Sequence, residues 1–254
     1  MKGLIYKDLM GLKKLRVSFI FVTVVTMIIA VMALLSARFG NLAVLEQQYQ
    51  VKGNAEFDVS PLKLLWYGLS FMMVLPVVAV GDVALNSFEA DARSGFINLA
   101  GALPVSVRQR VAARFITVLI SGGTGLLISL IISFILSFLT DIMSFGDFAG
   151  IVLSSASLMI IFFSIEMVLI FLVRGLKNSY CGLVSMMIMI VAAGLIFFDR
   201  IQTAVREESY LNLIADALRF AQSRWYLLAI AAVVFLAVSF IVSSVVAERK
   251  RGDI

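Results

Sequence analysis

The sequence contains no histidine, one cysteine and three prolines, and only 15% of its 254 residues are charged. Without histidine the chain lacks the side chain that most often serves acid–base catalysis near neutral pH and metal binding. The single cysteine, Cys181, has no partner for an internal disulfide, and its place at the start of an apolar run suits packing. The HExxH and GxSxG motifs and paired acids within apolar runs are also missing. These absences argue against an enzyme and against a metal site.

Apolar residues make up 61% of the chain, and the mean hydropathy is +1.04. Apolar runs of about 18 or more residues recur, which is the length a helix needs to cross a hydrocarbon core roughly 30 Å thick. We therefore expect an all-α polytopic protein of the lipid bilayer, with residues 1–254 forming a single transmembrane domain. No small-residue cleavage site follows the first run, so it is interpreted as an uncleaved span. The six predicted transmembrane helices are residues 17–36, 62–85, 112–139, 149–173, 180–198 and 225–247.

The basic residues predict the orientation of these spans, because lysine and arginine near span ends are retained in the cytoplasm. Fourteen of the 21 fall at the two termini, in the loop 86–111 together with the adjacent Arg114, and in the connector after the fourth span. The remaining seven fall in the other segments. Both termini and the loop 86–111 are thus expected in the cytoplasm, with residues 37–61 and 199–224 outside. This topology accounts for the net charge of +5, and no basic stripe with interleaved aromatics indicates nucleic-acid binding.

Two segments outside the spans have helical periodicity. Residues 1–16 predict a helix in the cytoplasmic interface, with Leu4, Ile5 and Leu9 on one arc. Asp8 falls inside that arc, which indicates either a protein neighbour or a helix that floats on anionic lipid. On the external side, the apolar spacing of 210–221 predicts a short helix that either caps the exit of a pathway or packs on the other outer connector.

The loop 86–111 is unusual because apolar and charged residues alternate in it. Ser94-Gly95 and Leu103-Pro104 predict breaks, and Ser106 with Gln109 three residues later has capping-box spacing, so a new helix is expected to begin there. Exposed apolar groups on such a loop are usually covered. Lipid headgroups, the N-terminal helix and another subunit are the three possible covers.

Polar residues within the spans have a structural and a functional interpretation. Glu166 should face protein or water, where it either bonds a neighbouring helix or contacts a proton or substrate. The glycines of Ser121–Gly125 favour close helix packing or a bend over a phosphate loop, because the sequence lacks the Lys-Ser/Thr ending of such loops. Several methionines fill the core or line a pathway for varied apolar substrates. These are Met72, Met73, Met186, Met187 and Met189.

In layout the chain resembles the permease subunits of type-2 ABC exporters. The shared features are the start KGLIYKDL, six spans with both ends inside, and a cytoplasmic turn between the second and third spans. In that turn such permeases carry an acidic stretch after a Phe, then a Gly, then a Leu-Pro-Val-Ser-Arg-like element. The matching positions here are Phe88, Glu89, Asp91, Gly95, Leu103, Pro104, Val105, Ser106 and Arg108. The chain departs from the pattern at Val107, between Ser106 and Arg108, and at Arg114, where a lysine is common.

The resemblance implies that transport and ATP hydrolysis are carried out by separate subunits. Two permease copies, here expected as a homodimer, would pair with two cytoplasmic ATP-binding cassette subunits that hold ATP and Mg²⁺, so this chain itself needs no cofactor. The turn between spans two and three would be the coupling helix that docks on the ATPase. The resemblance also implies short external helices between spans five and six, where residues 210–221 fall. The implied coupling residues are Phe88, Glu89, Asp91, Arg93, Phe96, Leu103, Pro104 and Arg108. The implied substrate pathway contains Met72, Met73, Met186, Met189 and Glu166.

The same resemblance implies a multi-pass protein of the bacterial plasma membrane. The KGLIYKDL start looks like that of exporters for peptides such as phenol-soluble modulins and bacteriocins, and drugs or lipids are alternative cargoes. Two other classes stay open, an ion-coupled secondary transporter that uses Glu166 and a membrane enzyme or sensor. A secondary transporter usually has two related halves and several membrane acids, which are not seen here.

Overall fold

The computed structural model describes residues 2–11, 13–40, 44, 68–69, 74–78, 105–139, 144–173, 178–206 and 210–249. Every long element within these ranges is an α-helix. The seven helices are α1 (Lys2–Gly11), α2 (Lys13–Phe39), α6 (Val107–Leu139), α7 (Phe145–Leu172), α8 (Asn178–Ile196), α9 (Phe198–Arg206) and α10 (Tyr210–Arg249).

Three of these helices contain stretches long and apolar enough to cross a membrane, namely Val107–Phe138, Phe145–Leu172 and Asp216–Arg249. Shorter apolar stretches, Thr23–Ser36 and Tyr180–Ile196, lie in α2 and α8. The prediction of an all-helical, multi-pass membrane protein is therefore confirmed. The predicted span 62–85 lies outside the described residues except at 68–69 and 74–78, so the count of six stays a prediction.

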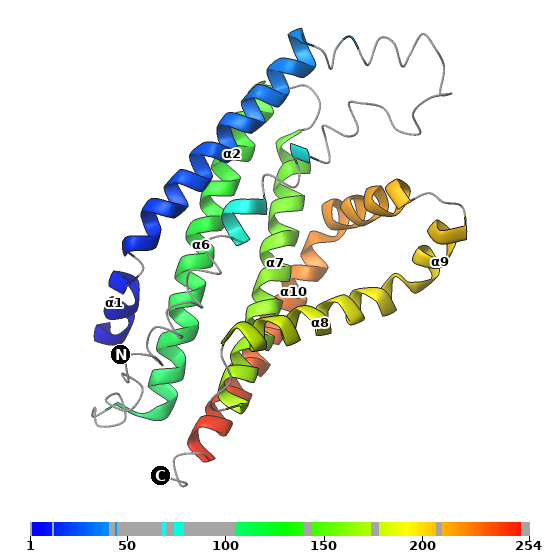
Figure 1. Cartoon of the computed structure of the whole chain (residues 1–254). Coiled ribbons are helices and arrows are strands. Elements are labelled where there is room, and N and C mark those ends of the chain that lie inside the picture. Colours follow the sequence, from blue (N-terminus) through cyan, green and yellow to red (C-terminus); the bar gives the residue numbers. More distant parts are fainter. Residues whose placement is uncertain are drawn as a thin grey trace.

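The helices form a bundle with two distinct ends. The start of α1, the start of α6 and the last turn of α10 lie together at one end, called the inner end below (Figure 1). At the opposite, outer end α7 begins and α10 turns into the bundle. Helix α8 departs from the bundle and leads to α9 at the periphery (Figure 1).

Side-chain caps fix where two of the long helices begin. Before α6, the amide of Gln109 donates to Ser106 Oγ at 3.2 Å, and the amide of Ser106 donates to Gln109 Oε1 at 3.3 Å. This is the capping box that the sequence predicted, and it is confirmed. Before α7, Ser144 and Asp147 form a second reciprocal cap. Each cap satisfies amides that a helix start leaves without partners.

Two apolar clusters fill the bundle along its length. Toward the outer end, α2, α6 and α7 contribute buried side chains that include Leu34, Leu136 and Phe148. Toward the inner end, Phe115 of α6 meets Phe240 of α10 edge to face, with ring centroids 5.7 Å apart. The second cluster therefore ties α6, α7 and α10 together close to the inner end.

Helices α7 and α10 form the most extensive helix pair of the bundle. A Cβ on Gly150 of α7 would lie only 2.8 Å from the Gln222 carbonyl oxygen of α10. Two serine hydroxyls also cross the interface, since Ser154 donates to the Ala221 carbonyl at 2.5 Å and Ser239 donates to the Ser164 carbonyl at 2.5 Å. Small residues of this kind let membrane helices approach closely.

Helix α10 bends at Arg224, whose backbone angles of −120° and 20° are not helical. The bend separates an outer segment, 210–223, from the part that descends through the bundle. A break of this kind disturbs the carbonyls of the preceding turn, and the hydrogen bond from Ser154 satisfies one of them. Trp225 and Tyr226 follow the bend, as aromatic residues do at a membrane–water interface.

Candidate functional site

The described part of the candidate coupling site is the start of α6, at the inner end of the bundle (Figure 1). Of the eight coupling residues predicted from the resemblance, Arg108 is within the described ranges. Its Nε lies 2.8 Å from Glu248 Oε1 on the last turn of α10, and both side chains are exposed to solvent. The other seven, Phe88, Glu89, Asp91, Arg93, Phe96, Leu103 and Pro104, lie outside the described residues.

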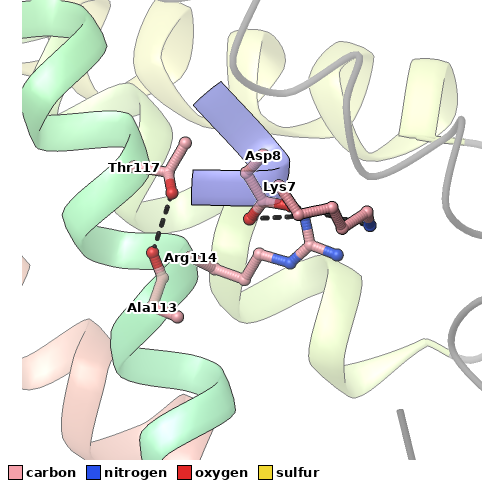
Figure 2. Close-up of polar contacts among 5 residues, drawn as sticks. All are labelled: Lys7, Asp8, Ala113, Arg114 and Thr117. Atoms are coloured by element: carbon pink, nitrogen blue, oxygen red, sulfur yellow. Dashed lines mark hydrogen bonds and ion pairs between the residues drawn. The ribbon is translucent and has the colours of Figure 1, made fainter. Parts of the chain in front are cut away.

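A second ion pair joins helix α1 to α6. Arg114 Nη1 lies 3.0 Å from Asp8 Oδ2, and Lys7 Nζ lies 3.7 Å from Asp8 Oδ1 (Figure 2). Asp8 is only 4% exposed, and the Arg114 side chain is 16% exposed. Of the two alternatives that the sequence left open for Asp8, the structure favours a protein neighbour over a helix that floats on lipid.

The two ion pairs point to different sides of α6. Arg108 and Arg114 are six residues apart, which at about 100° per residue separates their directions by about 120°. Arg108 accordingly reaches α10, and Arg114 reaches α1. The first two turns of α6 are thus paired with α10 through Arg108 and with α1 through Arg114, at the end of the predicted loop 86–111.

Glu166 lies where α7 and α8 meet near the inner end. Its residue is 4% exposed, and an added Cβ on Gly182 of α8 would lie 3.4 Å from Glu166 Oε1. Cys181 and Ser185 of α8 are also buried at this contact. Glu166 therefore faces protein, as a carboxyl within a span should.

The two described methionines that were predicted for the substrate pathway differ in exposure. Met186 and Met189 lie four and seven residues after Gly182, which places both on the same face of α8 as Gly182. Met189 is partly buried, whereas Met186 is 54% exposed. Met72 and Met73 lie outside the described residues, so their position relative to Glu166 stays a prediction.

At the outer end the structure describes α9, whose residues the sequence analysis did not identify as a helix. Helix α9 pairs with the outer segment of α10 through Arg200 Nη1 and Asp216 Oδ2, which are 2.7 Å apart. Phe197, just before α9, meets Phe220 edge to face at 5.8 Å. The signal that could have found α9 is the spacing of Phe198, Ile201 and Val205 along one helical face.

The ion pairs of Arg108, Arg114 and Arg200 join one helix to another. Within the described ranges, no group of three His, Cys, Asp or Glu side chains is placed to hold a metal ion. The charged groups at the inner end instead link helices to one another. Such links can carry a displacement from a docked partner into the bundle.

Residues 62–250 of the chain match a family described as ABC-2 family transporter protein. No curated protein matches the chain. No solved structure matches it either. The matched range includes the loop 86–111 and all of α6, α7, α8, α9 and α10.

Proposed function

Because the chain belongs to the ABC-2 transporter family, we propose that it is the permease subunit of an ATP-driven exporter in a bacterial plasma membrane. The observation that carries this proposal is the family match, which extends without a break from residue 62 to residue 250 and so includes the loop 86–111. ATP and Mg²⁺ belong to a separate cytoplasmic ATPase subunit in this proposal.

The loop 86–111 is the proposed docking element for that ATPase. Its apolar residues fill a groove on the partner, and its charged residues fix the register at the rim. Support comes from the inner end of the bundle, because the loop leads directly into the capped and doubly paired start of α6. A displacement of the loop therefore acts on helices α1, α6 and α10 together.

Two permease copies and two ATPase copies complete the proposed assembly. Helix α8 supports a second permease copy, since it projects from the bundle and exposes large apolar side chains on successive turns. Among them are Leu183, Met187 and Val191, which are 60%, 64% and 59% exposed. A homodimer that packs α8 of one copy against the other would cover part of this surface and leave the rest to lipid.

The proposed cargo is an amphipathic or hydrophobic molecule, with antimicrobial or toxin peptides as the first choice. Methionine side chains adapt to varied apolar shapes, and Met186 and Met187 are exposed on α8. Drugs and lipids share the required apolar character. An export assay in inverted vesicles can compare a dye-labelled amphipathic helical peptide, a lipophilic dye and a headgroup-labelled phospholipid.

The decisive test is affinity purification of the tagged chain from its native membrane in mild detergent. The proposed function predicts a cytoplasmic ATPase at a one-to-one ratio with the permease and Mg²⁺-dependent ATP hydrolysis by the purified complex. Purification of the intact chain without any ATPase, together with export that follows an imposed pH gradient, would establish the ion-coupled alternative instead.

Glu166 provides a separate prediction about the energy source. Glu166→Gln is expected to retain at least roughly half of ATP-driven peptide export, because the amide keeps the volume and polar contacts of the carboxyl and an ATP-driven pump needs no proton carrier. Glu166→Leu should export less, since a branched apolar side chain cannot reproduce those contacts. Loss of all export in a correctly assembled Glu166→Gln complex would contradict the prediction.

A further inference from the structure

A charged pair buried between two helices calls for an explanation beyond packing. Removing ions from water is costly, and apolar residues of similar volume often stabilise such a contact as well or better. The charges of Asp8 and Arg114 distinguish the pair from an apolar contact, because Arg114 Nη1 lies 3.0 Å from Asp8 Oδ2 and the attraction between two opposite charges weakens as they separate. The pair therefore opposes a displacement of α1 along α6.

The position of the pair relates it to the loop 86–111. Arg114 lies seven residues after Val107, or about two turns into the helix that follows the loop. Helix α1 packs more extensively on α6 than on α2, although α2 is its neighbour along the chain. Helix α1 is thus held mainly by α6, the helix that follows the loop, and less by α2, the helix that it precedes.

The surroundings of Asp8 support a fixed geometry. Leu4, Ile5 and Leu9 of α1 are partly buried beside it, while Tyr6 and Met10 are exposed on the opposite face. On α6, the nearby Thr117 hydroxyl donates to the Ala113 carbonyl at 2.9 Å, within its own helix (Figure 2).

We propose that the ion pair between Asp8 and Arg114 is a positioning contact that makes α1 and the first turns of α6 move as one body when the docked ATPase displaces the loop 86–111. This inference rests on the proposed function, because the displacement comes from ATP binding and hydrolysis in the partner. In this scheme Asp8 and Arg114 contact neither nucleotide nor cargo. They act by keeping the position of α1 relative to α6 constant.

The test measures one distance in two states of the complete complex with its ATPase. Spin labels replace Tyr6 on α1 and Ile120 on α6, which are 63% and 41% exposed, in a Cys181→Ser background. Labelled copies are diluted with unlabelled permease so that distances between copies are rare. The two states are the nucleotide-free complex and the complex trapped with ATP and vanadate.

With the pair intact, the distance between the labels should be the same in the nucleotide-free complex and in the complex trapped with ATP and vanadate. In Asp8→Asn and in Arg114→Gln it should shift between the states by about 5 Å, on the order of one helical turn. Asp8→Glu keeps the charge and should restore the single distance. If the pair only stabilises the fold, the distance between the labels in Asp8→Asn should be the same in the two nucleotide states. That result would overturn the inference.

The outcomes separate the inference from the function on which it rests. If the wild-type complex holds an ATPase and hydrolyses ATP while Asp8→Asn behaves as wild type in both states, the exporter proposal stands and the inference fails. If no ATPase accompanies the wild-type chain, the exporter proposal fails and the inference fails with it.

Discussion

Replacement of Gly150 by valine is expected to lower the stability of the bundle by about 2 to 3 kcal/mol. The first added atom would lie 2.8 Å from the Gln222 carbonyl oxygen and 3.2 Å from the Gln222 Cα, and both are backbone atoms that cannot rotate away. Helices α7 and α10 would have to separate at this point. Their separation would also strain the hydrogen bonds that Ser154 and Asp147 make to the outer segment of α10.

The measurement is the midpoint of thermal unfolding of the purified protein in detergent, which should fall by roughly 5 to 10 °C. Gly194→Val is the matched control, because Gly194 is also helical and an added Cβ there has nothing within 4 Å. It makes the same chemical change without the contact and should unfold within about 2 °C of wild type. Equal midpoints for Gly150→Val and Gly194→Val would show that α7 and α10 are not in close contact at Gly150.

Much of the fold could be predicted because the bilayer restricts what a chain can do. Apolar runs in hydrocarbon must satisfy their backbone groups internally, so composition alone predicts helices. The start of α6 could also be predicted, because the three-residue spacing of Ser106 and Gln109 allows each side chain to accept a hydrogen bond from the other residue's amide. Asp8 was only narrowed to two alternatives, a protein neighbour or anionic lipid, because an acid within an apolar arc does not by itself identify its partner.

The pairing of helices could not be predicted in the same way. A helix that is apolar on every side, such as α7, does not indicate which face meets which neighbour. The glycines of Ser121–Gly125 predicted close packing or a bend, and added Cβ atoms on Gly122 and Gly123 have nothing within 4 Å among the described residues, so the structure shows no close packing at these two positions. The close approach is at Gly150, a lone glycine without a motif around it.

The candidate site shows the same limit. Arg108 was assigned to the rim of an ATPase interface because it lies in the motif, but its observed contact is Glu248, 140 residues later in the chain. Contacts over such a separation depend on the packing of α6 against α10, which no local pattern encodes. The bend at Arg224 likewise involves a distant residue, because Ser154 of α7 donates a hydrogen bond to the Ala221 carbonyl just before the bend.

The strongest functional prediction concerns Phe96 and Leu103 in the loop 86–111. If these side chains are buried anchors in a groove of the ATPase, Phe96→Ala and Leu103→Ala should each cost on the order of 2 kcal/mol of binding, or about a 30-fold rise in Kd. The measurement is a titration of the purified permease in detergent with the purified ATPase subunit. ATP hydrolysis in whatever complex survives should no longer drive export of the dye-labelled peptide.

Two controls identify the source of any loss. Leu45→Ala makes the same kind of truncation in the external connector and should leave the Kd unchanged. Arg108→Gln removes an exposed charge that pairs with Glu248, and exposed pairs contribute little and are screened by salt. Its effect on Kd should therefore stay below about fivefold and shrink further at high ionic strength. Wild-type affinity and wild-type coupling in both Phe96→Ala and Leu103→Ala would show that the loop 86–111 is not the docking element, and the ATPase would then have to bind at α1 or at the end of α10.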